Sequence, residues 1–418
     1  MFTHNVGFLV HLTQKKKTNP LYYYYKSTIF NHKKQTMKFT LKLCWLLTLI
    51  QNQNYKPFYL LLITIFFSCD FVSKKRNVTS SHNCIPSNSK LNDLDNLNEI
   101  TYAENGSLEG MIFVEGGEFE MGGDNDDAMQ DEFPKHKVVI NSFWMDETEV
   151  TNDQFMKFVE STGYVTTAEK AIDWNEIKKI LPPNTPKPHD SLLSPASLIF
   201  YQTNAEDMND YTQWWRLEKN ANWKQPFGKD SDIKGKGNHP VIHISWEDAI
   251  AYCKWSGKRL PTEAEFEYAS RGGLKNNIYS WGDEPIYEGN VKANTWEGKF
   301  PSSNNMKDNY YYTSPVKSFK PNGYGFYDLG GNVWEWCSDW YHSNYYEMIG
   351  SSVTSNPRGP ETSYDPNEPY SPKKVMRGGS FLCNDSYCSG FRNSMRMKST
   401  PDSSSLHAGF RTVVDVKS

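Results

Sequence analysis

Two cysteines five positions apart, Cys383 and Cys388, are the residues whose type and spacing point most directly to chemistry. A fully extended chain would hold their α-carbons roughly 16 Å apart. The intervening Asn384, Asp385 and Ser386 favour turns, so this segment can fold back and bring the two sulfur atoms together. Converging sulfurs form either a disulfide, the usual pairing in an exported protein, or a soft two-thiolate site of the kind that selects Cu(I). Both alternatives are open at this point, and the choice decides whether an enzyme is expected.

The composition excludes several classes of function. The 418 residues can form one large domain or two ordinary ones. Aromatic residues reach 15% although the mean hydropathy is −0.69, which favours a globular fold whose core and clefts depend on aromatic side chains. A formal net charge of −4 gives no electrostatic support for nucleic-acid binding. Seven cysteines are too few for a disulfide scaffold, and a four-ligand zinc site is not expected because no second Cys or His pair with ligand spacing lies nearby.

Residues 1–69 are predicted to be a targeting segment that exports the protein to the periplasm or cell envelope. Met37 opens a basic stretch typical of a signal peptide and is a candidate native start. Two apolar runs, 43–50 and 58–68, follow it, and each is shorter than the about 20 residues that a membrane-spanning helix needs. The second run ends in Phe-Phe-Ser-Cys, similar to a lipoprotein cleavage box, so Cys69 is a candidate for lipid anchoring. A plain signal peptide or an uncleaved anchor is the alternative.

The rest of the chain is expected to contain one folded domain behind a tether. Residues 70–108 are rich in Ser, Asn and Lys and have few apolar positions, so they are predicted to be disordered. The folded domain is then expected to span 109–418.

Within that domain the sequence predicts short strands and long loops. Residues 111–123 indicate two strands around a Gly-Gly turn, and the alternation over 138–145 predicts another strand. Residues 165–240 have no clear period and are either disordered or an ordered surface of loops, and their tryptophans favour order. Short strands and long ordered loops are also expected from 281 onward.

Three helices are predicted from their capping residues. Thr151 and Asn152 offer N-caps for the first, and Ser245 caps a second that Gly257 ends. Thr262 caps a third, whose first turns are acidic. The predicted fold class is therefore α+β with little regular structure and no internal repeat.

Two further clusters could bind a ligand, and each has a simpler explanation. Oxygen-bearing residues on neighbouring loops are typical of Ca²⁺ sites, although loop caps and tight turns use the same residue types. Arginines near the two cysteines could recognise a carboxylate or could pair with surrounding acids. The first cluster comprises Asn294, Thr295, Asp308 and Tyr310 with Asp328, Gly331, Val333 and Glu335; the second comprises Arg377, Arg392, Arg396 and Arg411.

The ordered motifs over 111–415 resemble the formylglycine-generating enzymes, a family of sulfatase-modifying oxidases. Most of them mark a broad superfamily that also contains non-catalytic lipoproteins and iron-dependent sulfoxide synthases. The segment from Cys383 to Cys388, with Ser-Thr-Pro-Asp-Ser-Ser at 399–404, resembles the oxidase branch and its two active-site cysteines. The superfamily motifs are Glu-Gly-Gly-Glu-Phe-Glu-Met-Gly at 115–122, Asp-Glu-Thr-Glu-Val-Thr-Asn at 146–152, His-Pro-Val-Ile-His-Ile-Ser-Trp at 239–246, Gly-Lys-Arg-Leu-Pro-Thr-Glu-Ala-Glu at 257–265, Gly-Asn-Val-Trp-Glu-Trp at 331–336 and Arg-Gly-Gly-Ser at 377–380.

The resemblance implies a fold and a reaction. The fold would be an elaborated C-type-lectin-like variant with low regular secondary structure. The reaction would oxidise a cysteine in a Cys-x-Pro-x-Arg-type segment of a sulfatase to Cα-formylglycine, with O₂ as co-substrate. The partner would be an unfolded or partly folded sulfatase polypeptide, and the enzyme is expected to be a monomer.

The resemblance also implies the site residues. Cys383 and Cys388 would hold Cu(I), and the substrate thiolate would complete a three-sulfur site for O₂ activation. Two structural Ca²⁺ ions would bind the two loop sets named above, partly through the backbone carbonyls of Thr295, Tyr310, Gly331 and Val333. The remaining active-site positions are Ser380 beside the copper, Trp334 as a wall of the pocket, and Tyr387, Arg396 and Glu149.

This chain departs from vertebrate members at several positions. Ser270, Asn393 and Thr412 replace three cysteines of their disulfides, which leaves Cys253 unpaired. Asn384 and His407 also differ from some members near the expected pocket, so substrate positioning is expected to differ in detail.

Two alternative functions have different consequences. A non-catalytic, lectin-like envelope lipoprotein of the same superfamily would not need both cysteines. An ergothioneine-type iron enzyme would need a His-x₃-His-x-Glu-like ligand set and a helical partner domain, and neither is visible in the sequence.

Overall fold

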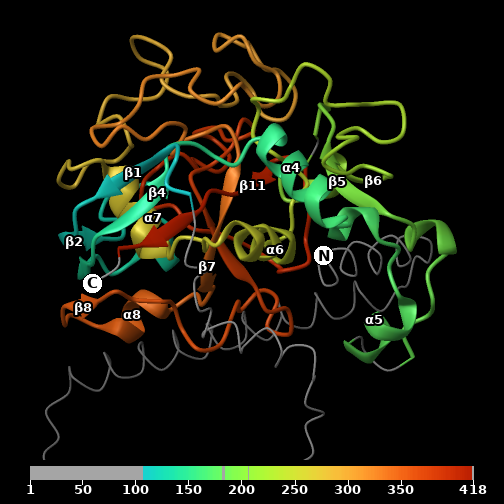
Figure 1. Cartoon of the computed structure of the whole chain (residues 1–418), viewed down its shortest axis with the longest axis horizontal. Coiled ribbons are helices and arrows are strands. Elements are labelled where there is room, and N and C mark those ends of the chain that lie inside the picture. Colours follow the sequence, from blue (N-terminus) through green and yellow to red (C-terminus); the bar gives the residue numbers. More distant parts are fainter. Residues whose placement is uncertain (1–106, 181–183, 206, 417–418) are drawn as a thin grey trace, which may run out of the picture. The chain divides into compact units, whose positions relative to one another are not determined.

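Small sheets and short helices make up the fold in the computed structural model, which describes residues 107–180, 184–205 and 207–416 (Figure 1). The described part shows no helix long and apolar enough to cross a membrane. The predicted targeting segment with Cys69 and the tether up to residue 106 lie outside the described residues. The mixture of short strands and helices agrees with the predicted α+β class.

The strands of this part of the chain form four sheets, each of two to four strands. One sheet contains β1 (Met111–Val114), β4 (Phe143–Asp146) and β12 (Val413–Asp415), in that order. A second contains β2 (Gly117–Met121), β3 (His136–Ile140) and β8 (Thr354–Ser355). The third has the order β10 (Met397–Ser399), β9 (Lys374–Arg377), β7 (Trp334–Trp340), β11 (Ala408–Gly409), and β5 (Ala196–Phe200) pairs with β6 (Trp215–Lys219) in the fourth.

The strands near the start of the domain are arranged differently from the prediction. The two strands predicted over 111–123 are present, but β1 and β2 belong to different sheets. The single strand predicted over 138–145 is wrong, because β3 ends at Ile140 and β4 begins at Phe143. The break between β1 and β2 and the break between β3 and β4 lie where these two segments of the chain cross. A Cβ on Gly116 would lie 2.4 Å from the Ile140 carbonyl oxygen. The Gly116 N–H donates to Ser142 Oγ at 2.9 Å. Glycine is therefore required for the chain to pass from one sheet to the next.

The three predicted helices are confirmed as α4 (Asn152–Thr162), α6 (Trp246–Ser256) and α7 (Glu263–Arg271). Each begins with a reciprocal capping box, in which the cap side chain accepts an N–H from the third helical residue and that residue's side chain bonds back. Gly257 ends α6 in the left-handed conformation, at φ 68°. Two short helices were not predicted, α5 (Trp174–Ile180) and α8 (Tyr345–Ile349).

The two long segments without a sequence period are ordered wherever the structure describes them. In the 165–240 segment, Trp214 and Trp223 are fully buried and β5 and β6 pair, which confirms the ordered interpretation. From residue 272 to 333, between α7 and β7, the chain runs as loops without a helix or strand, coloured yellow to orange in Figure 1. Trp296 and Phe300 anchor these loops in a buried aromatic cluster.

Buried ion pairs join α7 to the sheet that carries β7 and β9. Arg377, fully buried at the end of β9, donates to Glu263 Oε1 at 2.8 Å and to Glu267 Oε2 at 2.5 Å. Arg396 binds Glu263 in turn, through Nε at 2.7 Å. The acidic face of α7 is thus buried against arginines. The other two arginines of the predicted cluster also pair with acids, Arg392 with Glu132 and Arg411 with Glu335.

The positions of the missing vertebrate cysteines are filled by other interactions. Ser270 Oγ donates to Asn393 Oδ1 at 2.6 Å, so a hydrogen bond joins two of these positions. Cys253 is a buried free thiol, as predicted.

Candidate active site

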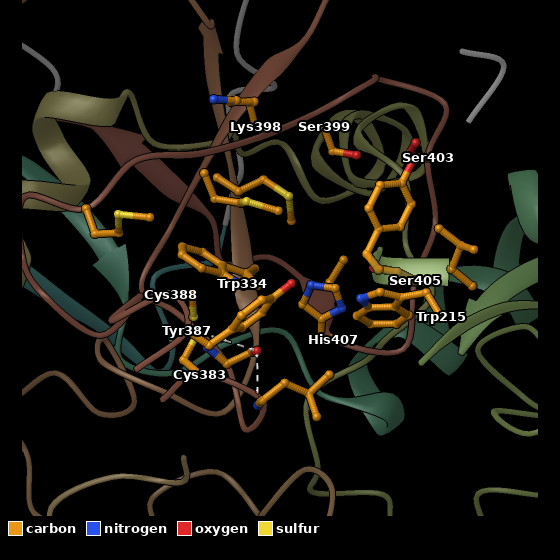
Figure 2. Close-up of a pocket in the computed structure, with 18 of the residues that line it drawn as sticks. Trp215, Trp334, Cys383, Tyr387, Cys388, Lys398, Ser399, Ser403, Ser405 and His407 are labelled. Carbon is orange, nitrogen blue, oxygen red and sulfur yellow. Dashed lines mark hydrogen bonds between the residues drawn. The ribbon is translucent and has the colours of Figure 1, made fainter. Parts of the chain in front are cut away.

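A cavity of about 320 Å³ lies over one face of the β10-β9-β7-β11 sheet, and both predicted cysteines line it. Figure 2 shows Cys383 and Cys388 side by side, with Trp334 and Tyr387 next to them and the Trp215 and His407 rings further along the wall. A cavity of this size falls within the range of small-ligand and side-chain pockets.

Backbone geometry brings the two cysteines together, as the turn-forming residues between them predicted. The carbonyl of Asn384 accepts the N–H groups of Tyr387, Cys388 and Ser389, each at 3.0 Å, which reverses the chain after Cys383. The buried Asn384 side chain donates to the Trp296 carbonyl at 3.0 Å and so ties the turn to the aromatic loops. Asn384 therefore shapes the loop that carries Cys388.

The two sulfur atoms occupy different environments. Both cysteines are free thiols; Cys383 is 1% exposed, and Cys388 is half-buried. Burial, followed by the neighbouring Cys388, raises the pKa of Cys383 well above its ordinary value. Burial also works to raise the pKa of Cys388, but hydrogen bonding with Cys383 and with the backbone at Gly390 outweighs it, and this pKa is lowered. The pair can thus hold one thiol and one thiolate, and it is poised to become two thiolate ligands.

Ser380 contacts Cys383, and Trp334 lines the cavity next to the sulfur pair. The Ser380 N–H donates to Cys383 Sγ at 3.3 Å, and Ser380 Oγ lies 3.9 Å from the same sulfur. Trp334, 3% exposed, comes from β7. A Cβ on Gly390 would lie 2.5 Å both from Cys383 Sγ and from Trp334 Cζ2, so the Gly390 backbone seals the space between them. Sequence reasoning missed Gly390.

Tyr387 lies at the side of the cavity and keeps its proton. Its ring stacks on Phe300 at a centroid distance of 4.3 Å, and it is 37% exposed. Burial of its polar end raises its pKa to about 12, so the hydroxyl is a hydrogen-bond donor at neutral pH. Figure 2 shows this hydroxyl reaching toward the space between Trp334 and His407.

Two of the predicted site residues do not line the cavity. Arg396 is buried in its ion pair with Glu263. Glu149 is fully buried, and its Oε1 accepts from Asn332 Nδ2 at 3.0 Å. Glu149 therefore belongs with the predicted calcium loops, because Asn332 lies between Gly331 and Val333.

A buried histidine determines the direction in which one hydroxyl at the cavity wall donates its hydrogen bond. The sequence did not indicate this arrangement. His243 Nε2 lies 3.0 Å from the Pro226 carbonyl oxygen, and its Nδ1 lies 2.7 Å from Ser197 Oγ. Because a carbonyl only accepts, Nε2 carries the proton and Nδ1 accepts the Ser197 hydroxyl. Ser197 Oγ is 2.8 Å from Ser404 Oγ, so Ser404 must donate to it. Ser404 lines the cavity, so the direction of its hydroxyl is fixed at the cavity wall.

This histidine predicts a pH dependence of stability. Burial lowers the pKa of His243 to about 3, whereas the unfolded chain would have a value near about 6.5. Between these values only the unfolded chain binds the proton, so this contribution to stability falls as the pH is lowered through the window. We expect wild type to be more stable than His243→Asn at about pH 7, with a smaller margin at about pH 4.

Urea unfolding of both proteins at the two pH values measures that margin. Asparagine tolerates the positive φ of 59° at this position, so the backbone is not the variable. A difference in unfolding free energy between the two proteins that stays constant with pH would contradict the assignment of His243 as a buried, neutral side chain.

The residues of the first predicted calcium set lie close together in the loops before β7. Asp308 accepts the N–H groups of Tyr310 at 2.9 Å and Thr295 at 3.2 Å. Burial raises the pKa of Asp308 to about 6. Asn294 Oδ1 is buried without a hydrogen-bond partner, while its Nδ2 donates to the Tyr312 carbonyl at 2.8 Å. An orphaned amide oxygen beside a carboxylate fits a hard cation.

The second set is organised around an ion pair. Arg411 binds both oxygens of Glu335, each at 2.7 Å. Glu149 Oε2 is buried without a hydrogen-bond partner, and burial followed by Asp328 and Glu335 raises the pKa of Glu149 well above its usual range. No group of three or more His, Cys, Asp or Glu side chains converges on a metal position among the residues described, so either cation site would rely on amide and carbonyl oxygens.

Comparison with known proteins identifies the class to which this fold and site belong. Residues 97–416 match the family described as sulfatase-modifying factor enzyme 1-like domain, and the chain belongs to this family. The formylglycine-generating enzyme of Streptomyces coelicolor is 42% identical over 321 residues, which cover 74% of this chain and 90% of that protein. The elaborated lectin-like fold expected from the sequence is thereby confirmed.

Two further similar proteins are an inactive relative and a solved structure. The inactive Cα-formylglycine-generating enzyme 2 of Bos taurus is 36% identical over 317 residues, covering 73% of this chain and 88% of that protein. The solved structure of PvdO from Pseudomonas aeruginosa is 23% identical, with a TM-score of 0.47, covering 73% of this chain and 94% of that chain. Because a relative named inactive is this similar, catalysis must be argued from the cavity itself.

Proposed function

We propose that this protein oxidises a cysteine in a Cys-x-Pro-x-Arg-type segment of a sulfatase to Cα-formylglycine, with O₂ as the oxidant. The observation that carries the proposal is the pair of free thiols, Cys383 and Cys388, side by side in a cavity. Relatives named formylglycine-generating enzyme support the substrate class, because that name describes the product. The client is expected to reach the protein before its own folding is complete, since its cysteine must enter the cavity.

The donor set of the cavity fits Cu(I). Two sulfur ligands, one of them with a lowered pKa, are soft donors that select Cu(I) over hard cations. Bound there, Cu(I) would supply the centre at which O₂ and the substrate thiol react. Ser380 orients Cys383 through its N–H group.

The remaining cavity residues position the substrate. The buried Trp334 indole lies next to the sulfur pair and can limit the access of water there. The protonated Tyr387 hydroxyl can donate to a substrate carbonyl. A peptide backbone offers such carbonyls, so the cavity suits an extended chain.

The test is conversion of a synthetic peptide by the full-length protein. The protein is loaded with Cu(I) under reductant and incubated in air with a Cys-x-Pro-x-Arg peptide, and mass spectrometry follows the replacement of the thiol by an aldehyde. A second peptide, with Ala in place of Pro and Arg, measures sequence selectivity. Conversion of the first peptide alone supports the proposal. Binding of Cu(I) without conversion of either peptide would exclude this substrate motif, and failure to bind Cu(I) would favour the non-catalytic envelope protein.

We also propose that two Ca²⁺ ions stabilise the loops between α7 and β7. The first site, with Asn294 and Asp308, suits Ca²⁺ better, because the buried Asn294 side-chain oxygen has no hydrogen-bond partner. For the second site, the orphaned oxygen of Glu149 adds a ligand beside Asp328. These loops lack helix and strand ladders of their own, so an ion would replace the missing backbone bonds.

Removing calcium is therefore expected to lower the melting temperature. A ligand at a hundredfold excess over its dissociation constant contributes about 2.7 kcal/mol to stability. Calorimetry with and without chelator measures the loss, and Asp308→Asn should abolish most of the response. Asp232→Asn, at an exposed loop position, is the matched control and should respond like wild type. A melting curve of wild type that chelator leaves unchanged would contradict the proposal.

A further inference from the structure

Four methionines line the same cavity as the cysteine pair, and three of them, Met129, Met376 and Met397, form a second group of sulfur-bearing side chains. Met397 on β10 lies directly opposite Met376 on β9 in the antiparallel register, and Met376 lies opposite Trp336 on β7. Met397, Met376 and Trp336 all line the cavity, so these three side chains form a row across one face of the sheet. Directly opposed residues have Cβ atoms about 4.5–5.5 Å apart, so two flexible thioethers can meet there. Met129 reaches the same cavity from a separate segment.

The exposure of the three methionines falls from Met129 to Met376, and the two cysteines differ, since Cys383 is buried and Cys388 is half-buried. Met129 is 48% exposed, Met397 is partly buried, Met376 is 3% exposed and Cys383 is 1% exposed. A fourth lining methionine, Met395, is already engaged, because Arg392 Nη2 donates to its sulfur at 3.4 Å. In Figure 2 several sulfur atoms other than those of the cysteines lie near Trp334, on its side toward Lys398. The cavity therefore has soft donor atoms along its wall as well as at the cysteines.

Thioether sulfur is a neutral, soft ligand that favours Cu(I), and it binds more weakly than a thiolate. We propose that Met129, Met376 and Met397 form a thioether site that takes up Cu(I) and delivers it to Cys383 and Cys388. The inference rests on the proposed function, because it presumes that the cysteines accept Cu(I). Weak neutral ligands followed by charged thiolates give a gradient of affinity that directs the ion inward and does not retain it on the way.

A different occupant of the same wall is an apolar substrate side chain, since methionine-rich surfaces adapt to varied partners. Copper binding requires the methionine sulfur, whereas contact with an apolar substrate side chain does not. Leucine keeps the size and apolar surface of methionine and removes the sulfur, so Met→Leu eliminates copper binding but preserves a hydrophobic contact.

The experiment measures Cu(I) directly, without turnover. Full-length protein is titrated anaerobically with Cu(I) held by a chromophoric chelator, and stopped-flow absorbance follows transfer of the ion. Met376→Leu/Met397→Leu should slow transfer to the cysteines by about tenfold or more while leaving the final affinity unchanged. Met348→Leu, at a 62% exposed methionine on α8, is the control and should transfer at the wild-type rate.

A second background isolates the thioether site. Cys383→Ser/Cys388→Ser should retain a weak Cu(I) site with copper–sulfur scattering in X-ray absorption, and adding the two leucine substitutions should remove it. Absence of Cu(I) binding in the cysteine-free protein, or binding that survives those substitutions, would overturn this inference. Tight binding by wild type would still uphold the cysteine site, whereas no binding by wild type would refute the copper proposal itself. An increased peptide KM with unchanged copper transfer would assign the wall to the substrate and overturn the inference.

Discussion

Cys388→Ser is expected to abolish conversion of the sulfatase peptide while changing the free energy of unfolding by no more than about 0.5 kcal/mol. Cys388 is half-buried and lies on a turn held by backbone bonds to the Asn384 carbonyl, which serine leaves intact. Serine keeps the shape but replaces a soft, acidic sulfur with a hard hydroxyl. Removing one of two Cu(I) ligands should lower copper affinity by more than about a hundredfold, the upper range for the loss of supporting residues.

Peptide conversion and Cu(I) affinity are measured in parallel on Cys388→Ser and Cys383→Ser. Cys253→Ala is the control for loss of a thiol as such, because Cys253 is a buried free cysteine that does not line the cavity. It should retain conversion even if its melting temperature falls. Wild-type conversion by Cys388→Ser would contradict the assignment of the site. Unfolding of both cysteine variants would instead indicate that the pair is structural, as a disulfide would be.

Arg377→Met is expected to lower the free energy of unfolding by about 3–5 kcal/mol, the usual result of removing one partner from a buried ion pair. Arg377 is fully buried between two carboxylates of α7, Glu263 and Glu267. Methionine fills much of the same volume, so the loss reports the ion pairs that Arg377 makes with Glu263 and Glu267 and not a cavity. Arg396 still faces Glu263, and Arg271 still faces Glu267, which keeps the variant from losing every partner at once.

Denaturant unfolding measures this loss, and Arg216→Met is the matched control. Arg216 is exposed and lies over the Tyr201 ring at 4.4 Å, so its replacement should cost less than about 1 kcal/mol. Equal stabilities of the two variants would contradict the view that the buried network holds α7 against β9. A triple replacement of Arg377, Glu263 and Glu267 by apolar residues should lower the stability further, because it leaves Arg396 and Arg271 buried without their carboxylate partners.

Local signals in the sequence predicted the parts of the structure that depend on near neighbours. Thr151, Ser245 and Thr262 each marked a helix start, because a capping box is formed within four residues. The turn between Cys383 and Cys388 is also local, since the carbonyl of Asn384 closes it. The resemblance of ordered motifs supplied the family and the fold, which no local pattern contains.

Contacts between distant segments were beyond such reasoning. The strand over 138–145 was mispredicted because its break is set by the crossing of Gly116, more than twenty residues earlier. The acidic start of α7 has the composition of a solvated helix end, yet arginines from β9 and beyond bury it. Hydrophobic alternation carries no information about such partners.

The cavity that holds the two cysteines likewise combines features set by the local sequence with features set by the fold. The spacing of the two cysteines can be read from the sequence, and this spacing predicts a site that could bind a soft metal ion through sulfur. The folded sheet alone places Met376 opposite Met397, and a tertiary contact alone aligns His243 with Ser197 and Ser404. The physical reason is range: propensities and caps act over one or two turns of chain, whereas a pocket is built where segments hundreds of residues apart exclude water together.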